Sequence, residues 1–366
     1  MKILQIINSL GTGGAEKLLL DTLPLYREQG IEMDILLLWD NDCMFTQQLQ
    51  KLNCCKVYIL NKSSNTRAIY NPFLILKISK IIKDYDLVHV HLFPAQYFVA
   101  LANMLNGNKN KLLFTEHNTS NSRMASPFLA ILDRFFYKSY SKIVAISEGV
   151  KDSLGKHLKK QSKIEVIVNG VDTTKVSQAP LNVEIKNRFP DKETELIVQV
   201  GGFRIQKDQD TVIRSLVSLP INYHLLLIGD GERKDQLVDL VKQLSLVDRV
   251  HFLGIRNDVF SILKSVDIVV VSSHWEGFGL AAVEGMAARK PVVASDVPGL
   301  SEVVQGAGIL FPVSNSEQLA AEITALLENQ EHYQSVAVAC QQRAADYDIH
   351  KMVDQHIKLY KSVLET

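Results

Sequence analysis

The sequence predicts an α/β protein built from two Rossmann-like domains, and three features of the chain point to this class. The 366 residues are too many for one ordinary domain and suit two of middling size. Short apolar runs, rich in β-branched residues, alternate with segments whose apolar residues recur at helical spacing. Hydrophobic residues make up 46% of the chain and charged residues 22%, which is typical of a globular protein with a buried core.

The first domain opens with an apolar run at residues 2–7, a glycine-rich loop at 11–14 and a helical pattern. Strand, glycine loop and helix form the first half of a Rossmann-type unit. The loop is a poor dinucleotide fingerprint, because Glu16 stands in the place of the third glycine and would face a pyrophosphate. Continuous apolar runs predict further buried parallel strands at residues 33–39, 56–60, 87–91, 111–115, 142–146 and 164–168.

Two histidines stand where expected strands of this domain end. His91 is the last residue of the strand 87–91, and His117 follows the strand 111–115. Because ligands in open α/β sheets bind at the carboxyl ends of strands, both are well placed for a site, although His91 could equally be structural. We expect His89 to point to the opposite face of its strand and to be structural.

The second domain is expected to follow a linker at residues 178–180, with strands at 196–200, 224–228, 250–253, 269–271 and 291–295. A loop with two cations, Arg204 and Lys207, follows its first strand. On such a loop the two cations could reach a diphosphate from the side. The alternative is that both are ordinary surface cations.

The most specific pattern of the chain covers residues 269–287, where an apolar run turns through two glycines into a helical pattern. Glu276 is expected in the loop, and Glu284, seven intervening residues later, about a turn and a half inside the helix. The backbone N–H groups of Phe278, Gly279 and Leu280 would be available to an anion, because the first turn of a helix has no internal partners for them. The alternative is a strand–turn–helix unit with two solvated glutamates.

This segment resembles the E-x7-E signature of the retaining glycosyltransferases of family GT4, which have the GT-B fold of two Rossmann-like domains facing each other across a cleft. The resemblance implies a hexosyltransferase-type enzyme that needs no metal and no other cofactor. It would move a sugar from a nucleotide-diphosphate sugar, with UDP or GDP as the expected nucleotide, to a hydroxyl of a glycan or lipid-linked acceptor. Surface polysaccharide or glycolipid biosynthesis is the expected context.

The resemblance also assigns donor-binding roles in the second domain. Glu276 would hydrogen-bond donor-sugar hydroxyls, Glu284 would bind both ribose hydroxyls, and Lys207 would bind the pyrophosphate. Many members carry an arginine directly after the first glycine of the cationic loop, where this chain has Gly202, and we expect Arg204 to substitute for it.

Further roles follow from the same resemblance. Gly13 and Gly14 match a glycine loop that approaches the donor, and His117 matches a histidine that contacts the donor sugar. Gly254 and Ile255 resemble the turn that meets the nucleobase, where Arg256 could assist. The residues expected to act in catalysis are Glu276, Lys207, Arg204 and His117.

The expected division places an acceptor-binding domain at residues 1–176 and a nucleotide-sugar-binding domain at 177–349, with the helix 350–366 packing back onto the first. Residues 1–176 contain 22 Lys+Arg and 15 Asp+Glu (22 − 15 = +7), so the remainder of this neutral chain carries −7. The first half should therefore prefer an anionic partner. We expect no nucleic acid as a partner, because the chain as a whole is not basic.

Basic residues of the first half are interleaved with aromatic ones, which suits an anionic membrane surface or a lipid phosphate. A solvated helix face explains the same pattern. The basic residues are Arg123, Arg134, Lys138, Lys142, Lys151, Lys156, His157, Lys159, Lys160 and Lys163. With no apolar run of 18 residues and no signal-peptide pattern, we expect a cytoplasmic protein, peripheral at the inner membrane face.

The sequence leaves three alternatives: a metal site, an oxidoreductase and a non-catalytic binding protein. Asp-x-Asp occurs at residues 40/42, 84/86, 208/210 and 346/348, a pattern that can hold a divalent metal, but with 40 acidic residues such pairs arise easily. A nucleotide-cofactor oxidoreductase would need the glycine fingerprint that Glu16 interrupts. A non-catalytic sugar-nucleotide-binding protein with a degenerate site is the remaining alternative, which Gly202 favours and the joint presence of Lys207, Glu276 and Glu284 opposes.

Overall fold

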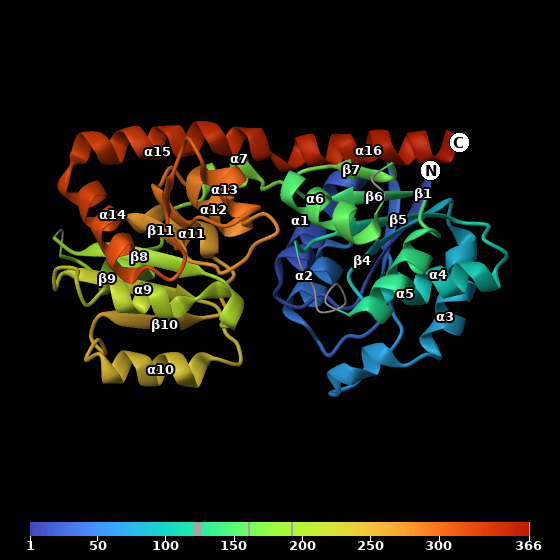
Figure 1. Ribbon diagram of the computed structural model, residues 1–366, viewed down its shortest axis with the longest axis horizontal. Helices are drawn as coiled ribbons and strands as arrows, with labels where there is room; N and C mark the ends of the chain where they lie inside the picture. Colours follow the sequence, from blue (N-terminus) through green and yellow to red (C-terminus); the bar gives the residue numbers. More distant parts are fainter. Residues whose placement is uncertain (120–125, 160–161, 192, 366) are drawn as a thin grey trace. The chain divides into compact units, whose positions relative to one another are not determined.

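The computed structural model describes residues 1–119, 126–159, 162–191 and 193–365. The chain folds into two compact units (Figure 1): unit 1 is Met1–Gly170 with Ile349–Thr366, and unit 2 is Val171–Asp348. The division thus falls six residues before the expected position 176 (176 − 170 = 6).

The expected linker at 178–180 belongs to unit 2. Helix α7 (Thr173–Gln178) ends at the first of these residues, and Asp172 caps its start by accepting a hydrogen bond from the Lys175 backbone N–H at 2.8 Å. Thr173 Oγ1 donates to Asp348 at 2.6 Å, which ties this helix to the end of the same unit. The proline at 180 marks the end of α7 and not a domain boundary.

Unit 1 contains a parallel sheet in the order β3-β2-β1-β4-β5-β6-β7, with seven strands in the described part of the chain. The order is that of a Rossmann-type sheet. The predicted strands are confirmed with small shifts at their ends. They are β1 (Lys2–Ile7), β2 (Glu32–Leu37), β3 (Val57–Ile59), β4 (Leu87–His91), β5 (Lys111–Glu116), β6 (Lys142–Ala145) and β7 (Ile164–Val166).

Helices cover both faces of this sheet, as continuous apolar strands require. One face packs against α1 and α16, whose Met352, Val353 and Tyr360 are buried in the same core cluster as the strands. The helices of unit 1 are α1 (Gly14–Glu28), α2 (Met44–Leu52), α3 (Leu74–Ile81), α4 (Ala95–Leu105), α5 (Pro127–Tyr137), α6 (Glu148–Leu158) and α16 (Ile349–Glu365), with short 3₁₀ turns at Thr66–Tyr70 and Ile82–Asp84.

Unit 2 repeats the architecture with a parallel sheet in the order β10-β9-β8-β11-β12-β13. Its strands are β8 (Glu195–Val200), β9 (Tyr223–Ile228), β10 (Val250–Gly254), β11 (Ile268–Val271), β12 (Val292–Ser295) and β13 (Ile309–Phe311). Its helices are α7, α8 (Val183–Arg188), α9 (Gln209–Ser215), α10 (Lys234–Gln243), α11 (Val259–Ser265), α12 (Leu280–Ala287), α13 (Leu300–Val304), α14 (Ser316–Glu328) and α15 (Gln330–Ala344), with 3₁₀ turns at Ile205–Lys207 and Ala345–Tyr347.

Helix α12 lies unusually close to the sheet of unit 2. A β-carbon built on Gly285 would stand 2.9 Å from the side chain of Val269 in β11, a separation that real β-carbons essentially never show. Gly285 therefore allows α12 to approach β11, and this close packing fixes the height of the helix over the strand that precedes it.

The interleaved basic residues of unit 1 differ in exposure: Lys138, Lys156 and Lys159 are exposed, whereas the other described ones are partly buried. Arg134 Nε donates to the His157 carbonyl at 3.0 Å, and Lys163 Nζ donates to the carbonyls of Lys138 and Tyr140. Arg123 and Lys160 lie outside the described residues. Within the described ranges, no helix combines the length and the apolar composition needed to cross a bilayer.

Candidate active site

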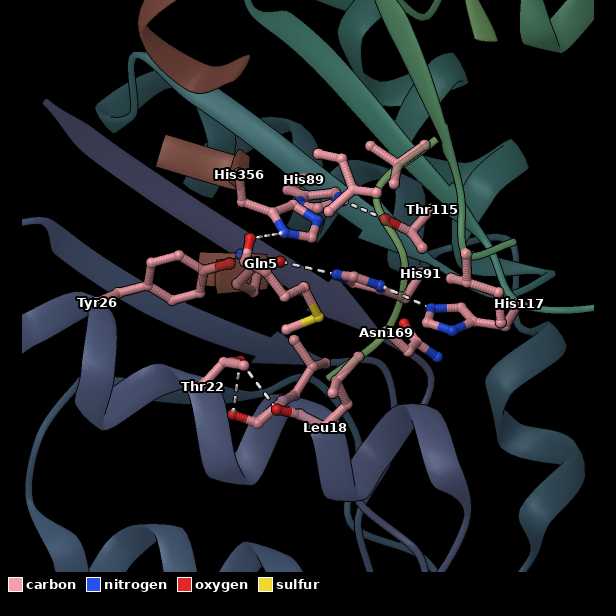
Figure 2. A pocket seen from close by; sticks show the side chains of 15 residues that line it. Gln5, Leu18, Thr22, Tyr26, His89, His91, Thr115, His117, Asn169 and His356 are labelled. Atoms are coloured by element: carbon pink, nitrogen blue, oxygen red, sulfur yellow. Dashed lines mark hydrogen bonds between the residues drawn. The ribbon is translucent and has the colours of Figure 1, made fainter. Parts of the chain in front are cut away.

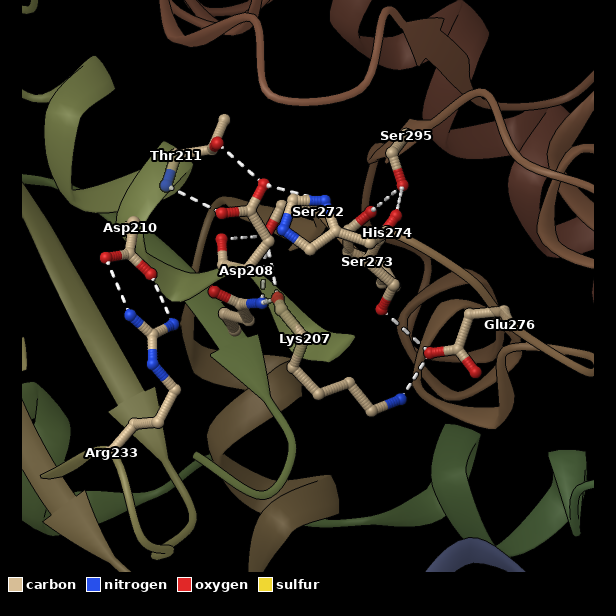
Figure 3. Close-up of polar contacts among 12 residues, drawn as sticks. Lys207, Asp208, Asp210, Thr211, Arg233, Ser272, Ser273, His274, Glu276 and Ser295 are labelled. Atoms are coloured by element: carbon tan, nitrogen blue, oxygen red, sulfur yellow. Dashed lines mark hydrogen bonds and ion pairs between the residues drawn. The ribbon is translucent and has the colours of Figure 1, made fainter. Parts of the chain in front are cut away.

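The expected site residues fall into two sets, one in each unit. Unit 2 holds the loop after β8, the loop after β11 and the turn after β10. Because β8 and β11 are hydrogen-bonded neighbours in one parallel sheet, their following loops meet at the same edge. Residues 206–208 and 272–276 are thereby brought together, and Figure 3 shows Lys207 and Asp208 beside Ser272, Ser273, His274 and Glu276.

The centre of this edge is an ion pair between the Lys207 ammonium and the Glu276 carboxylate (Figure 3). The same carboxylate oxygen accepts a hydrogen bond from Ser273 Oγ at 2.8 Å. Glu276 is buried, with 6% of its surface exposed, whereas 26% of the Lys207 side chain is exposed. A buried carboxylate is thus held by a cation and a hydroxyl, while the cation keeps access to solvent.

Backbone hydrogen bonds hold the two loops against each other. The His274 N–H donates to the Gln206 carbonyl at 2.8 Å, and the Gln206 side-chain amide donates to the Trp275 carbonyl at 2.9 Å. Ser272 Oγ, at the end of β11, lies 2.8 Å from the Asp208 carbonyl. Lys207 and Glu276 are therefore positioned by contacts to backbone carbonyls that do not depend on their own side chains.

Helix α12 begins beside this ion pair. Gly279 precedes it with φ = +92°, a conformation that side chains disfavour, and a β-carbon there would overlap Leu300 Cδ1. Within the described ranges, no hydrogen bond is recorded from the backbone N–H groups of Phe278, Gly279 or Leu280. Glu284 is the fifth residue of α12 and partly exposed, as the E-x7-E spacing predicts.

Arg204 is exposed and lies next to the glycine that stands where the family carries an arginine. A β-carbon built on Gly202 would stand 3.7 Å from Arg204 Nε, at ordinary van der Waals distance. Arg204 therefore brings its guanidinium to the place from which a side chain at position 202 would extend.

The turn expected to meet the nucleobase ends β10. Gly254 adopts φ = +67°, and Ile255 is about half exposed at 49%. Arg256 donates to Asp258 at 2.8 Å and to Glu184 at 2.7 Å, so its guanidinium is already engaged. The backbone of the turn is better placed to contact a ligand than this side chain.

The Asp-x-Asp pairs of the sequence serve local structure. Asp208 caps α9 by accepting a hydrogen bond from the Thr211 backbone N–H at 3.4 Å, and it accepts another from Thr211 Oγ1 at 2.7 Å. Asp210 accepts two from Arg233 at 2.6 and 3.0 Å. Asp40 accepts from Thr46 Oγ1 at 2.6 Å. In the part of the chain that the structure describes, no cluster of three His, Cys, Asp or Glu side chains is arranged to hold a metal ion.

In unit 1 the expected residue His117 belongs to a cluster of histidines around a small cavity (Figure 2). His91 and His117 are hydrogen-bonded through Nδ1 and Nε2 at 3.0 Å. The expectation that His89 points away from His91 is wrong: their ring centroids are only 4.5 Å apart. Residues i and i+2 of a strand share one face, because side chains alternate with a period of two.

Burial keeps these histidines neutral. It lowers the pKa of His117 to about 4 and that of His356, which α16 contributes, also to about 4. Burial lowers the pKa of His89 and His91 as well, and neighbouring imidazoles add to the effect. The described lining of the cavity contains no Asp, Glu, Lys or Arg. The described lining of this cavity therefore offers neutral hydrogen-bonding groups and no charge.

Gly13 and Gly14 stand at the first turn of α1, with Gly13 as its N-cap. A β-carbon on Gly13 would overlap the carboxylate of Glu16, the third residue of the helix. The Glu16 side chain thus folds back over Gly13. A glutamate at the third position of a helix commonly reaches back to the N-cap residue in this way. This explains why a glutamate is tolerated in a glycine loop.

Sequence reasoning missed three polar residues that complete these sites. Ser273 contacts Glu276, whereas Gln5 and Tyr360 contact the histidine cluster. Only Gln5 carried a signal, because it is a polar residue inside an otherwise apolar strand, at 1% exposure. No pattern distinguishes Ser273 or Tyr360 before the fold is known.

Two family models match the chain almost end to end. The model described as Glycosyltransferase Family 4 matches residues 12–175, and the one described as Glycosyl transferases group 1 matches residues 182–343. Among solved structures, HepE of Anabaena in complex with UDP-glucose superposes with a TM-score of 0.87 at 23% identity, covering 99% of this chain and 100% of that one.

Two curated relatives are similar over most of their length. N-acetyl-alpha-D-glucosaminyl L-malate synthase of Bacillus anthracis is 26% identical over 308 residues, which cover 81% of each chain. The N-acetylgalactosamine-N,N'-diacetylbacillosaminyl-diphospho-undecaprenol 4-alpha-N-acetylgalactosaminyltransferase of Campylobacter jejuni is 26% identical over 368 residues, covering 96% of this chain and 97% of that one. Together with the two Rossmann-like units, these matches show that the chain belongs to the GT4-type glycosyltransferases and has the GT-B fold.

Proposed function

We propose that the protein is a retaining hexosyltransferase that moves a sugar from a UDP-sugar to a hydroxyl of a lipid-linked glycan. The observation that carries the proposal is the Lys207–Glu276 ion pair beside the start of α12 in unit 2. A partly exposed cation and a helix N-terminus form a site for an anion such as a diphosphate. A buried carboxylate next to them suits sugar hydroxyls.

Donor binding would exchange the partner of Lys207. The ammonium, now paired with Glu276, would turn to the diphosphate, and Arg204 would contact the same group from the solvent side. Glu276 would then be released to accept hydrogen bonds from donor-sugar hydroxyls, while Ser273 continues to hold its carboxylate. The ion pair thus keeps both groups in place until the donor arrives.

The proposed reaction breaks the bond between the anomeric carbon and the β-phosphate oxygen, and its electron pair stays on the phosphate. The acceptor hydroxyl forms the new bond on the same face and gives its proton to the leaving phosphate oxygen, which retains the configuration. Lys207, Arg204 and the α12 amides would stabilise the growing phosphate charge without a metal. Glu276 would stabilise the positive charge on the sugar ring, and the proposed role of His117 in unit 1 is to contact a substrate hydroxyl.

The nucleotide and the acceptor are proposed from the relatives. HepE of Anabaena is solved with UDP and with UDP-glucose, which favours UDP over the GDP that the sequence leaves open. The Campylobacter jejuni relative acts on a sugar carried by diphospho-undecaprenol, which supports a lipid-linked acceptor. We extend this to a role in surface polysaccharide or glycolipid synthesis, with the exposed basic residues Lys138, Lys156 and Lys159 contacting anionic lipid.

A thermal-shift screen against UDP-, GDP- and ADP-sugars tests the donor first. A ligand at about 100 times its dissociation constant adds roughly 2.7 kcal/mol of stability, so the correct donor should raise Tm and the others should not. The donor found is then incubated with the protein alone and with a polyprenyl-diphosphate sugar. Transfer with the same anomeric configuration, followed by NMR of the product, is the expected result, whereas an inverted anomer contradicts the mechanism.

Two controls separate this function from its alternative. Slow hydrolysis of the donor in the absence of acceptor is expected of an enzyme and not of a binding protein with a degenerate site. Sedimentation with vesicles containing anionic lipid, compared with neutral vesicles, tests membrane association. A protein that stays in the supernatant with both loses the membrane part of the proposal but keeps the transfer reaction.

A further inference from the structure

A chain of hydrogen bonds runs behind His117 through three neighbouring strands of unit 1 (Figure 2). His117 Nε2 bonds to His91 Nδ1 at 3.0 Å, and His91 Nε2 bonds to Gln5 Oε1 at 2.8 Å. Gln5 lies in β1, His91 ends β4 and His117 follows β5, and these strands are adjacent in the sheet. The buried Gln5 amide is therefore the inner end of this hydrogen-bonded chain, and the His117 imidazole is its outer end at the edge of the sheet.

The orientation of the Gln5 amide follows from its other contacts. Its nitrogen lies 3.2 Å from the Tyr360 hydroxyl oxygen and 3.3 Å from the sulfur of Met33. The reverse orientation would place the amide oxygen against the sulfur, two lone-pair atoms with no proton between them. The amide oxygen accordingly faces His91.

This orientation sets the proton positions along the chain. The Gln5 oxygen can only accept, so His91 must carry its proton on Nε2. A neutral His91 then has a bare Nδ1, which must accept from His117 Nε2–H. His117 in turn is left with a bare Nδ1, which has no hydrogen-bond partner among the described residues.

We propose that Gln5 is a positioning residue that, through His91, holds His117 in the Nε2–H tautomer, so that His117 Nδ1 accepts a hydrogen bond from a substrate hydroxyl. His117 Nδ1 then cannot donate a hydrogen bond to the sugar. The sugar hydroxyl that contacts it must donate the hydrogen bond. The meeting with a sugar hydroxyl rests on the proposed function, whereas the tautomer does not.

The tautomer is measured directly on the ligand-free protein. Nitrogen-15 NMR of the full chain labelled in histidine, with the His117 signals assigned by loss in His117→Gln, distinguishes a protonated from a bare ring nitrogen. At pH 7.5 we expect a proton on Nε2 and none on Nδ1. A proton on His117 Nδ1 would show that the Gln5 amide is reversed and would overturn the proposal.

The variant Gln5→Glu tests the coupling at nearly constant shape. A carboxylate beside His91 favours the imidazolium form, whose Nδ1–H would donate to His117 Nε2 and move the His117 proton to Nδ1. We expect this shift in the NMR spectrum and a fall in kcat of about tenfold, the worth of one hydrogen bond, with an unchanged KM for the donor. A His117 tautomer unchanged by Gln5→Glu overturns the role of Gln5.

Thr22→Val is the matched control. Thr22 lines the same cavity and is similarly buried, but its hydroxyl bonds within its own helix, to the Leu18 and Leu19 carbonyls at 2.9 and 3.5 Å. It should leave the His117 tautomer and kcat as they are. If Gln5→Glu fails to fold, the wild-type spectrum still decides the tautomer. Absence of transfer with every donor, together with the expected tautomer, would refute the proposed function and leave this inference standing.

Discussion

In unit 2 the loops after β8 and β11 carry charge at the carboxyl edge of the sheet, in the form of Lys207 and the buried Glu276. In unit 1 the same edge, after β4 and β5, carries His91 and His117, which burial keeps neutral. Both units are Rossmann-like and both gather polar groups where parallel strands end. The fold therefore determines where each site lies, and the side chains determine what each can bind.

The contrast suits a ligand with a charged and an uncharged part. A diphosphate is recognised by cations and backbone amides, whereas a sugar offers only hydroxyls, which neutral acceptors and donors match without the cost of burying a charge. We interpret unit 2 as the part that binds the charge of the donor and unit 1 as the part that orients hydroxyls. Each prediction below tests one side of this comparison.

The largest effect is expected from Glu276→Ala, which removes the buried carboxylate that pairs with Lys207 at the unit 2 edge. Transfer should fall by about 10³-fold or more, because loss of a preorganised electrostatic group typically costs this much. UDP affinity should stay within about threefold, since Lys207 keeps its charge. Turnover and UDP titration measure the two quantities.

The exposed Glu317, in the first turn of α14, provides the control for this change. Glu317→Ala should leave turnover unchanged, and both variants should give the far-ultraviolet circular dichroism of the wild type. Full activity of a folded Glu276→Ala would remove this residue from the site.

Replacing Lys207 should weaken donor binding more than acceptor binding. Lys207→Met is expected to raise the dissociation constant for UDP about 10- to 100-fold, the range of a hydrogen bond to a charged group. The difference between variant and wild type should shrink at high salt, which screens the partly exposed ammonium. Lys234→Met, which removes an exposed cation 3.8 Å from Asp230, is the control and should leave UDP binding as it is. Equal affinity of Lys207→Met and wild type for UDP would show that Lys207 does not bind the diphosphate.

A third test concerns the unusual position of the arginine. Arg204→Gly should weaken UDP binding by about tenfold, and adding Gly202→Arg should restore it, because position 202 has room for a side chain. Calorimetric titration of the single and double variants gives both numbers. No loss in Arg204→Gly, or no recovery in the double variant, means that Arg204 does not substitute for the missing arginine.

The sequence predicted the unit 2 site far better than the unit 1 site, for physical reasons. Lys207 and Glu276 lie on loops after continuous apolar strands, and adjacent parallel strands bring such loops together however far apart they are in the chain. The histidine cluster depends on Tyr360 and His356, which come from α16. An apolar stripe shows that a helix packs against a core, but it does not show which polar side chains enter a cavity.

The stability of the protein should also depend on pH, and this dependence tests the neutrality of the unit 1 histidines. His117 and His356 have a pKa of about 4 in the folded protein and an ordinary value near 6.5 when unfolded. Between these values the unfolded chain binds protons that the folded chain does not. The free energy of unfolding should therefore fall as the pH is lowered from about 6.5 to 4, by up to roughly 1.4 kcal/mol per pH unit for each histidine.

The two tryptophans of the chain allow this change to be assigned to a unit. Trp39 lies in unit 1 and Trp275 in unit 2, so in a Trp275→Phe background the fluorescence reports unit 1 alone. In that background, denaturant titrations at pH 7 and 5.5 should show a smaller pH effect in His356→Leu, which removes one buried titrating group. The exposed His332 of unit 2 is the control, and His332→Leu should leave the pH effect unchanged. An equal pH effect in all three proteins would mean that the buried histidines take up protons in the folded state, and the contrast between a charged and a neutral edge would then fail below pH 6.5.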